Sequence, residues 1–305
     1  MLAPMQGVTK RDVRALFLAW VRPDVIFTEF MRVRPSASGS RLSAQDLREA
    51  QSAQQGVPLV AQLIGRERAA LVEAAEEAQR RGAVHLNLNL GCPFGRMSSG
   101  SGGQMLQRPE ALREVLPALR SVVGGTLSVK VRSGYDDPEQ IFSLLPLFES
   151  AGVDFLVLHP RTVVQEYEGR ADHRVTARVV RQTRLPVIAN GDVRTAAQGL
   201  RVLGETGAAG LMLGRGAISD PLLFERLRGK APAEVAPKER AATLRHYLGE
   251  LVARYGATFC GDAQVLANLR GLLEHIDEAG WPQVFKRLRR AKSVQAFAAA
   301  LEELV

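Results

Sequence analysis

VHLNLNLGCP, residues 84–93, begins as a buried β-strand and ends in a cysteine and a proline at the start of a glycine-rich loop. Similar short apolar runs recur along the chain and start about 23–42 residues apart, which suits one βα unit each. Strands that are apolar at nearly every position are typical of a parallel sheet covered by helices. The eight predicted strands span residues 1–4, 24–29, 58–63, 84–89, 126–131, 153–158, 186–190 and 209–213.

Segments with helical periodicity separate these strands, for example at residues 66–81 and 109–122. In the second segment, Pro109 followed by Glu110 is a favourable first helical turn. Strands that each precede a helix predict an α/β fold of the (β/α)8 TIM-barrel type. The alternative, an open doubly wound sheet, would carry GxGxxG after its first strand, whereas this chain has APMQG at residues 3–7.

The pattern changes after about residue 231, and no β-like run follows. The proline-punctuated segment KAPAEVAPKER, residues 230–240, is predicted to be a linker. Helical patterns then occupy residues 238–255, 262–276 and 291–304. We therefore predict a catalytic barrel over residues 1–230 and an all-helical domain over residues 235–305.

The bulk composition limits the classes of protein that the chain can belong to. The net charge of +8 favours a polyanionic partner, although basic surfaces are common and this signal is weak alone. No apolar run approaches the ~20 residues of a membrane helix, so we expect a cytoplasmic protein without a membrane partner. Cys92 and Cys260 show no metal-ligand spacing, and no cluster of histidines or carboxylates does, so we expect no metal.

Polar residues follow the predicted strands at their carboxyl ends, where a barrel of this type carries its active site. One such residue could be a satisfied core group, but a set of them at corresponding positions is hard to explain by stability alone. The predicted mouth is therefore large and polar. It includes Gln6, Glu29, Gln62, Asn87, Asn89, Lys130, Arg132, His159, Arg161 and Asn190.

The last two strand ends carry glycine motifs, NGD at residues 190–192 and GRGA at residues 214–217. A single such pair of glycines would indicate only a turn. Glycines at these two strand ends, however, lie where barrels of this type build a phosphate site from backbone N–H groups and a helix N-terminus. This predicts a phosphorylated ligand, with Lys130 as a fixed cation in the same mouth.

Cys92 begins the glycine-rich loop over this mouth. A lone cysteine is most often a small buried hydrophobic residue, and Cys260 keeps that interpretation. At the mouth, Cys92 could be a nucleophile or a general acid. Pro93 has no backbone N–H for an oxyanion hole and no histidine is near in sequence, so we favour a proton donor. The segment SSGSGG, residues 98–103, would let the loop close over a substrate.

A dense basic run lies in the predicted helical domain. It consists of Lys286, Arg287, Arg289, Arg290 and Lys292. Such a run is either a solvated helix face or a surface that contacts a phosphate backbone, and the sequence leaves both open.

Taken in order, eight motifs resemble the tRNA-dihydrouridine synthases, which are flavoenzymes with an FMN-binding barrel and a C-terminal helical domain. The resemblance covers essentially the whole chain, and NLGCP within residues 89–93 is its most specific part. The motifs are LAPMQGVT (2–9), TEF (28–30), AQLIG (61–65), LNLNLGCP (86–93), SVKVRSG (128–134), VLHPRT (157–162), VIANGDV (187–193) and LMLGRGA (211–217).

The resemblance implies roles for single residues. Asn89 would contact the target uracil, and Cys92 would be the general acid. Arg270, Lys286, Arg287 and Arg290 are candidates for RNA contact, although the helix around Arg270 offers few basic residues. FMN would be bound by Pro4, Met5, Gln6, Gln62, Lys130, His159, Asn190, Gly191, Asp192, Gly214 and Arg215.

The implied reaction is reduction of the C5–C6 bond of a uridine in the D-loop of tRNA, with NADPH as the reductant of FMN. TEFMRV and GSGG lean towards the subgroup that acts on uridine 16. The uridine must leave its stack to reach the flavin. We also expect the enzyme to be a monomer. Two alternatives stay open: an FMN barrel that acts on a free pyrimidine, and a tRNA-binding factor with a vestigial flavin site.

Overall fold

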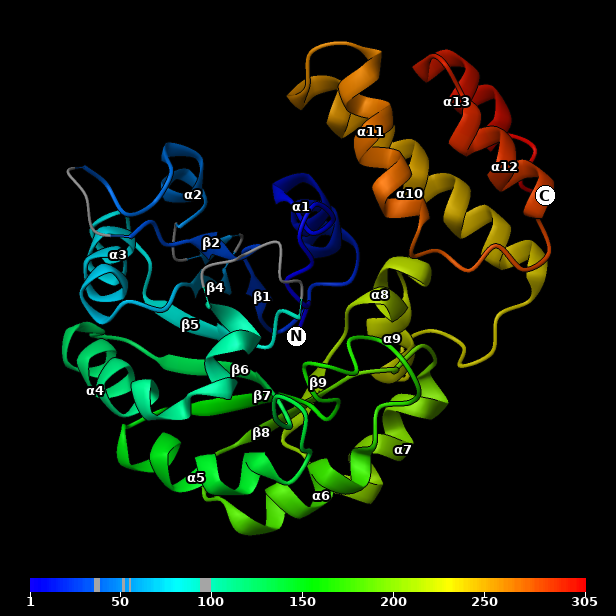
Figure 1. Cartoon of the computed structure of the whole chain (residues 1–305). Helices are drawn as coiled ribbons and strands as arrows, with labels where there is room; N and C mark the ends of the chain where they lie inside the picture. The colour runs from blue at the N-terminus through cyan, green and yellow to red at the C-terminus, as the bar shows by residue number, and fades with distance from the viewer. Residues whose placement is uncertain (36–38, 51–52, 55, 94–99) are drawn as a thin grey trace. The chain divides into compact units, whose positions relative to one another are not determined.

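A computed structural model describes residues 1–35, 39–50, 53–54, 56–93 and 100–305. Its main sheet is parallel, and its strands follow one another in the order β1-β4-β5-β6-β7-β8-β9 (Figure 1). Leu2 bridges Ile26 on one side and Leu213 on the other, which closes the sheet. The strands are β1 (Ile26–Phe27), β4 (Val57–Ile64), β5 (His85–Leu90), β6 (Leu127–Arg132), β7 (Phe155–His159), β8 (Val187–Asn190) and β9 (Gly210–Met212).

The predicted TIM barrel is confirmed, because the eight positions around this sheet coincide with the eight predicted runs. Two short strands were not predicted. β2 (Met31–Arg32) pairs with the end of β4, and β3 (Ala53–Gln54) pairs antiparallel with its beginning. Both have only two residues, too few to show a periodic pattern.

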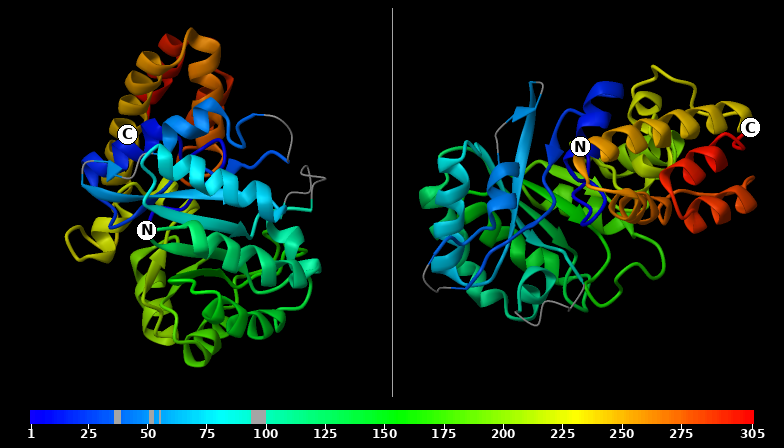
Figure 2. Two further views of the ribbon diagram at one scale, coloured as in Figure 1. Left: turned by 90° about the vertical axis from the view of Figure 1, so that its left-hand side faces the viewer. Right: turned by 90° about the horizontal axis from the view of Figure 1, so that it is seen from above.

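Helices cover the outside of the sheet (Figure 2). The predicted helix at residues 109–122 begins as the 3-10 turn η2 (Pro109–Ala111) and continues as α4. Another 3-10 helix, η1 (Gly102–Gln107), follows the cysteine loop. The helices are α1 (Arg11–Trp20), α2 (Ala44–Glu49), α3 (Arg68–Arg80), α4 (Leu112–Val122), α5 (Gln140–Ser150), α6 (His173–Gln182), α7 (Ala196–Thr206), α8 (Arg215–Ser219) and α9 (Leu223–Leu227).

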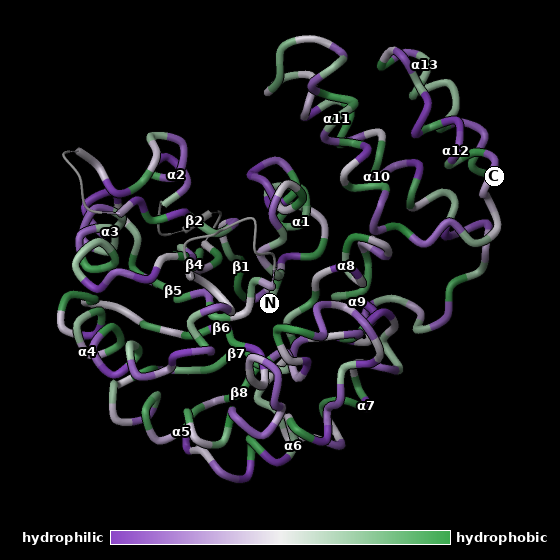
Figure 3. Tube along the Cα trace, in the orientation of Figure 1, coloured by the Kyte–Doolittle hydropathy of each residue, from purple (hydrophilic) through white to green (hydrophobic). Residues whose placement is uncertain are grey.

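Two hydrophobic layers form the core of the barrel among the described residues. The larger layer packs the apolar stripes of α3 to α6 on the outer face of the sheet, and the hydropathy colours alternate along these helices (Figure 3). The smaller layer fills the barrel interior with Ala3, Phe27, Val60, Val157, Ile188 and Met212. Side chains two residues apart on a strand lie on the same face of the sheet. The residues two positions after these apolar ones therefore also face the barrel interior, and several of them are polar.

The chain folds into two compact units, and the boundary between them crosses the sequence several times. The barrel unit comprises residues 1–4, 24–192 and 200–213. The second unit comprises residues 5–23, 193–199 and 214–305.

The second unit holds α1, α8 and α9 together with four C-terminal helices. These are α10 (Pro237–Thr258), α11 (Asp262–Leu273), α12 (Pro282–Arg290) and α13 (Val294–Leu301). Phe17 of α1 makes edge contacts with Phe224 of α9 and with Tyr247 of α10, so α1 packs against both helices. The predicted linker is shorter than expected, because Pro237 starts α10 and favours that first helical position.

Candidate active site

Inward-facing polar side chains of β4, β5 and β6 gather inside the barrel, from the second residue of β6 to the carboxyl ends of β4 and β5. Gln62, Asn87 and Asn89 form one hydrogen-bonded set with Ser128, and all four side chains are buried. The strand register brings them together: Gln62 is paired with Asn87, and Asn87 with Ser128. The predicted residues Gln62 and Asn89 therefore do meet at one edge of the barrel.

The backbone at Cys92 is held from both sides. Its N–H donates to Asn89 Oδ1 (3.0 Å), and its carbonyl accepts from the N–H of Gly103 (3.2 Å). A Cβ on Gly103 would lie 2.9 Å from that carbonyl oxygen and 2.7 Å from Val163 Cγ2, so only glycine fits there. Cys92 is partly exposed, whereas Cys260 is exposed, so the prediction that Cys260 is buried is wrong. The predicted closing loop lies partly outside the described residues, because residues 94–99 are not among them.

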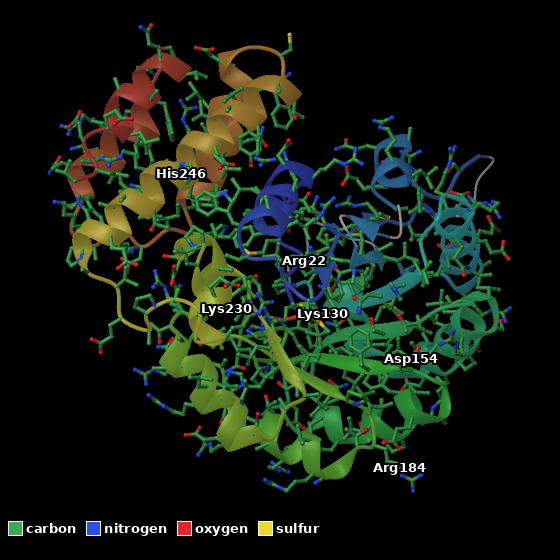
Figure 4. The ribbon with its side chains drawn as sticks, turned by 180° about the vertical axis from the view of Figure 1, so that it is seen from behind. Arg22, Lys130, Asp154, Arg184, Lys230 and His246 are labelled. Carbon is green, nitrogen blue, oxygen red and sulfur yellow. The ribbon has the colours of Figure 1, made fainter. Side chains whose placement is uncertain are left out.

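Lys130 lies two residues beyond Ser128 on the same face of β6, among the barrel strands (Figure 4). The pKa of Lys130 is lowered from 10.5 to about 8, mainly by burial and also by the Arg132 cation, while the charge of Cys92 partly opposes the change. Among the described residues, none accepts a hydrogen bond from its Nζ. Lys130 therefore places a positive charge in a buried environment that disfavours the charged form.

Arg132, at the end of β6, is 2% exposed. Its guanidinium donates to the carbonyl oxygens of Gly91 (2.9 Å), Thr162 (2.7 Å) and Glu166 (2.6 Å), and it lies over the ring of Tyr167. Burial is the main cause that lowers the pKa of Arg132. The arginine thus ties the start of the cysteine loop to the loop that follows β7.

The loop after β7 is held by Arg161, which is also buried. Its guanidinium pairs with both carboxylate oxygens of Asp192 (3.1 and 2.6 Å) and donates to the carbonyl oxygens of Glu168 and Gly169. Nη1 also lies 3.3 Å from His159 Nε2. Because a guanidinium can only donate, Nε2 of His159 is the acceptor in that contact.

The NGD turn at residues 190–192 packs tightly on this arrangement. Gly191 has φ +123°, and a Cβ there would lie 2.5 Å from His159 Cδ2. Its carbonyl oxygen lies 3.0 Å from His173 Nε2. Asn190 donates to the carbonyl oxygen of Met212 (2.8 Å), which ties β8 to β9. His159, Asn190, Gly191 and Asp192, all predicted, therefore lie together, while their role towards a cofactor stays a prediction.

The remaining predicted cofactor residues divide between the units. Pro4 ends the first strand position in the barrel unit, and the other four belong to the second unit. There, Met5 is fixed by Thr9, whose hydroxyl accepts from the Met5 N–H (2.8 Å), and Gln6 is exposed. Gly214 is the N-cap of α8. The pKa of His275 is lowered mainly by burial and, to a smaller extent, by the charge of Arg215.

The candidate RNA-contact residues differ in their surroundings. Arg270 donates to the carbonyl oxygens of Arg289 (2.9 Å) and Ala291 (2.7 Å), so it caps the C-terminal end of α12. Arg287 pairs with Glu303. Lys286 and Arg290 are exposed, and no carboxylate of the described residues pairs with either.

Sequence patterns did not indicate Ser128, Tyr167 or His173. Ser128 could have been found, because it lies two residues before Lys130 and so shares its face of the strand. Tyr167 and His173 lie in and just beyond an irregular loop, where no periodicity relates them to the strand ends. No group of acidic, histidine or cysteine side chains with metal-binding geometry occurs in the part of the chain that the structure describes. Within it, no helix is long and apolar enough to span a membrane.

Comparisons with known proteins agree on the family. The family model of the dihydrouridine synthases matches residues 1–304. The tRNA-dihydrouridine(16) synthase of Haemophilus influenzae is 32% identical, with 99% of this chain and 98% of that protein covered. A probable tRNA-dihydrouridine synthase of Rhodobacter capsulatus is 33% identical, with 78% and 73% covered.

Among solved structures, a morphinone reductase is similar to the barrel. It has a TM-score of 0.55 and 17% identity over 78% of this chain and 89% of that one, and this likeness supports the fold alone. The family model and the full-length relative decide the assignment. The chain belongs to the dihydrouridine synthase family.

Proposed function

We propose that the protein reduces the C5–C6 bond of a D-loop uridine in tRNA, uridine 16 in the first instance, with FMN as cofactor and NADPH as reductant. The observation that carries the proposal is Cys92, held by its backbone at the rim of a mouth whose polar groups converge from β4 to β8. The relatives named for uridine 16 support the choice of position.

The residues of the mouth fit a flavin. The cation of Lys130, which no described residue pairs with, and the remaining amide N–H of Gln62 suit the carbonyl oxygens and ring nitrogens at the polar edge of an isoalloxazine. We assign the ribityl phosphate to the NGD turn, which the close packing of Gly191 on His159 holds in a backbone conformation that glycine favours. When bound and reduced by NADPH, FMN supplies a hydride for uridine C6.

Cys92 supplies the other half of the reduction. Its Sγ–H bond breaks, the proton goes to uridine C5, and the S–H electron pair stays on sulfur as a thiolate that water reprotonates. The charge of Cys92 raises the pKa of Lys130 and of Arg132, so both cations lie within electrostatic reach of its sulfur. Asn89 donates to a uracil carbonyl oxygen and so orients the base.

Contacts outside the mouth would hold the tRNA. We assign phosphate contact to the exposed cations Lys286 and Arg290, while Arg270 acts indirectly by capping the helix that carries them. Because the second unit carries these cations, a small-molecule enzyme has no evident use for them.

The test is purified protein, reconstituted with FMN and given NADPH and tRNA that lacks dihydrouridine. We expect dihydrouridine at position 16 by site-specific mapping, and none from free uridine. Cys92→Ala should keep flavin binding and reduction by NADPH but lose about 10²-fold or more of uridine reduction. Cys260→Ala, at the exposed second cysteine, is the control. Normal turnover by Cys92→Ala would contradict the assignment of the acid.

A further inference from the structure

We propose that Asn87 and Ser128 are positioning residues that fix which way the amides of Gln62 and Asn89 point. Neither residue needs to touch a ligand for this. The inference rests on the proposed function in one respect, namely that Gln62 and Asn89 face flavin and uracil. It concerns a chain of hydrogen bonds, here called the amide relay, through Asn89, Gln62, Asn87 and Ser128.

The first end of the amide relay is fixed by backbone donors. Asn89 Oδ1 accepts from the N–H groups of Gly91 (2.9 Å) and Cys92 (3.0 Å). Backbone N–H groups can only donate, so the oxygen of Asn89 must face them and its Nδ2 must face Gln62. The contact from Asn89 Nδ2 to Gln62 Oε1 is 2.9 Å.

The direction then passes from residue to residue. With Oε1 facing Asn89, Gln62 directs Nε2 at Asn87 Oδ1, 2.8 Å away. Asn87 in turn directs Nδ2 at Ser128 Oγ, also 2.8 Å away. The Ser128 hydroxyl donates to the carbonyl oxygen of Leu86 at 3.3 Å. A carbonyl can only accept, so this contact favours the same direction, but the hydroxyl can turn and holds it less firmly than the backbone donors hold the first end.

Burial makes this direction costly to reverse. Gln62 and Ser128 are 0% exposed, Asn87 is 1% and Asn89 is 7% exposed. Flipping one amide would set donor against donor and acceptor against acceptor at its neighbours. Each buried polar atom left without a partner costs about 1–3 kcal/mol.

The fixed direction decides what the mouth offers to a ligand. Both acceptor positions of Asn89 Oδ1 are occupied by backbone donors, so Asn89 can present only its second N–H. It can therefore donate to a carbonyl oxygen, as in uracil, and cannot accept from an amino group, as in cytosine. Gln62 likewise keeps one N–H for a ligand.

Two substitutions at residue 87 separate this role from mere packing. Asn87→Asp keeps an acceptor for Gln62 Nε2, and Ser128 can turn its hydroxyl to donate to it. Asn87→Leu fills similar space but leaves Gln62 Nε2 without its acceptor. We expect FMN Kd to stay within about twofold of wild type for Asn87→Asp and to rise about tenfold for Asn87→Leu. A packing role predicts that FMN Kd stays near the wild-type value for both variants, because both side chains fill similar space.

Ser128→Ala has a closely matched control in Ser133→Ala. The Ser133 hydroxyl is also 0% exposed and donates to a backbone carbonyl oxygen, that of Pro160, at 3.3 Å, but it lies outside the amide relay. In a Cys260→Ser background, without flavin, we expect Ser128→Ala to change the rate of Cys92 alkylation about threefold or more, because the Asn89 hold on the loop loosens. Ser133→Ala should match wild type.

The outcomes distinguish the two proposals. If the wild type fails to bind FMN or to form dihydrouridine, the proposed function is wrong. If the wild type does both, two results would overturn the role of the amide relay. These are Asn87→Leu binding FMN as wild type does, or Ser128→Ala and Ser133→Ala reacting alike. Thermal melting of each variant identifies any that is unfolded.

Discussion

Replacing Asp192 by Asn tests the buried ion pair that joins β7 to β8. Asp192 accepts two hydrogen bonds from Arg161 and a third from the N–H of Ala171 (2.8 Å). The Arg161 side chain is only 2% exposed, whereas that of Asp192 is 32% exposed. Asp192 also has φ +52°, a backbone conformation that asparagine tolerates as well as aspartate does. The substitution therefore removes charge without adding backbone strain.

The size of the effect follows from the burial of Arg161. Breaking a buried ion pair by removing one partner costs about 3–5 kcal/mol, and Asn keeps one oxygen acceptor, so we expect about 3 kcal/mol. At about 2–4 °C per kcal/mol for a barrel of this size, Tm should fall by roughly 6–12 °C. The FMN Kd should also rise, because Asp192 shapes the turn after Asn190.

The assay is thermal denaturation of the apo-protein, followed by titration with FMN. Asp172→Asn is the matched control, because Asp172 pairs with the 90% exposed side chain of Arg174. Such a pair contributes at most about 1 kcal/mol, and Asn is as good an N-cap for α6 as Asp. Equal Tm and equal FMN Kd for the two variants would refute the reasoning.

Three further changes test single features of the mouth and of α12. The pKa of Lys130, about 8, lies below its ordinary 10.5, so the unfolded chain binds more protons between these values and stability rises with pH there. Lys130→Met removes the buried charge, so its Tm should exceed that of the wild type, and the difference in Tm should shrink as the pH rises from about 8 to 10.5. A difference in Tm that stays constant over this pH range would contradict the reasoning. Gly103→Ala should cost about 1–3 kcal/mol by overpacking, measured by Tm, whereas Gly124→Ala, whose nearest contact would be 3.9 Å away, should cost far less. Replacing Lys286 and Arg290 by Ala should each reduce the slope of log Kd for tRNA against log salt by about 1, and unchanged slopes would return them to a solvated face.

The sequence predicts the barrel well, because each strand is a short apolar run with a polar end, and this pattern is local. The same rule places Gln62, Lys130 and His159 in one mouth. What it does not predict is the partner of each side chain. Arg270 shows this plainly: the family resemblance made it a candidate for RNA contact, which stays a prediction, and nothing in the sequence indicated that its guanidinium caps α12 through two carbonyl oxygens. Such a contact depends on how helices pack, which no local pattern encodes.

The amide relay also bears on how this chain can change over generations. Its members are 25, 27 and 41 positions apart along the sequence, yet each supplies what the next requires. A carboxylate at residue 87, for example, would oblige both of its neighbours to be donors. A single substitution that keeps what each neighbour needs, such as Asp at residue 87, should therefore be accepted alone, and one that removes it should be found only together with a change at the neighbour.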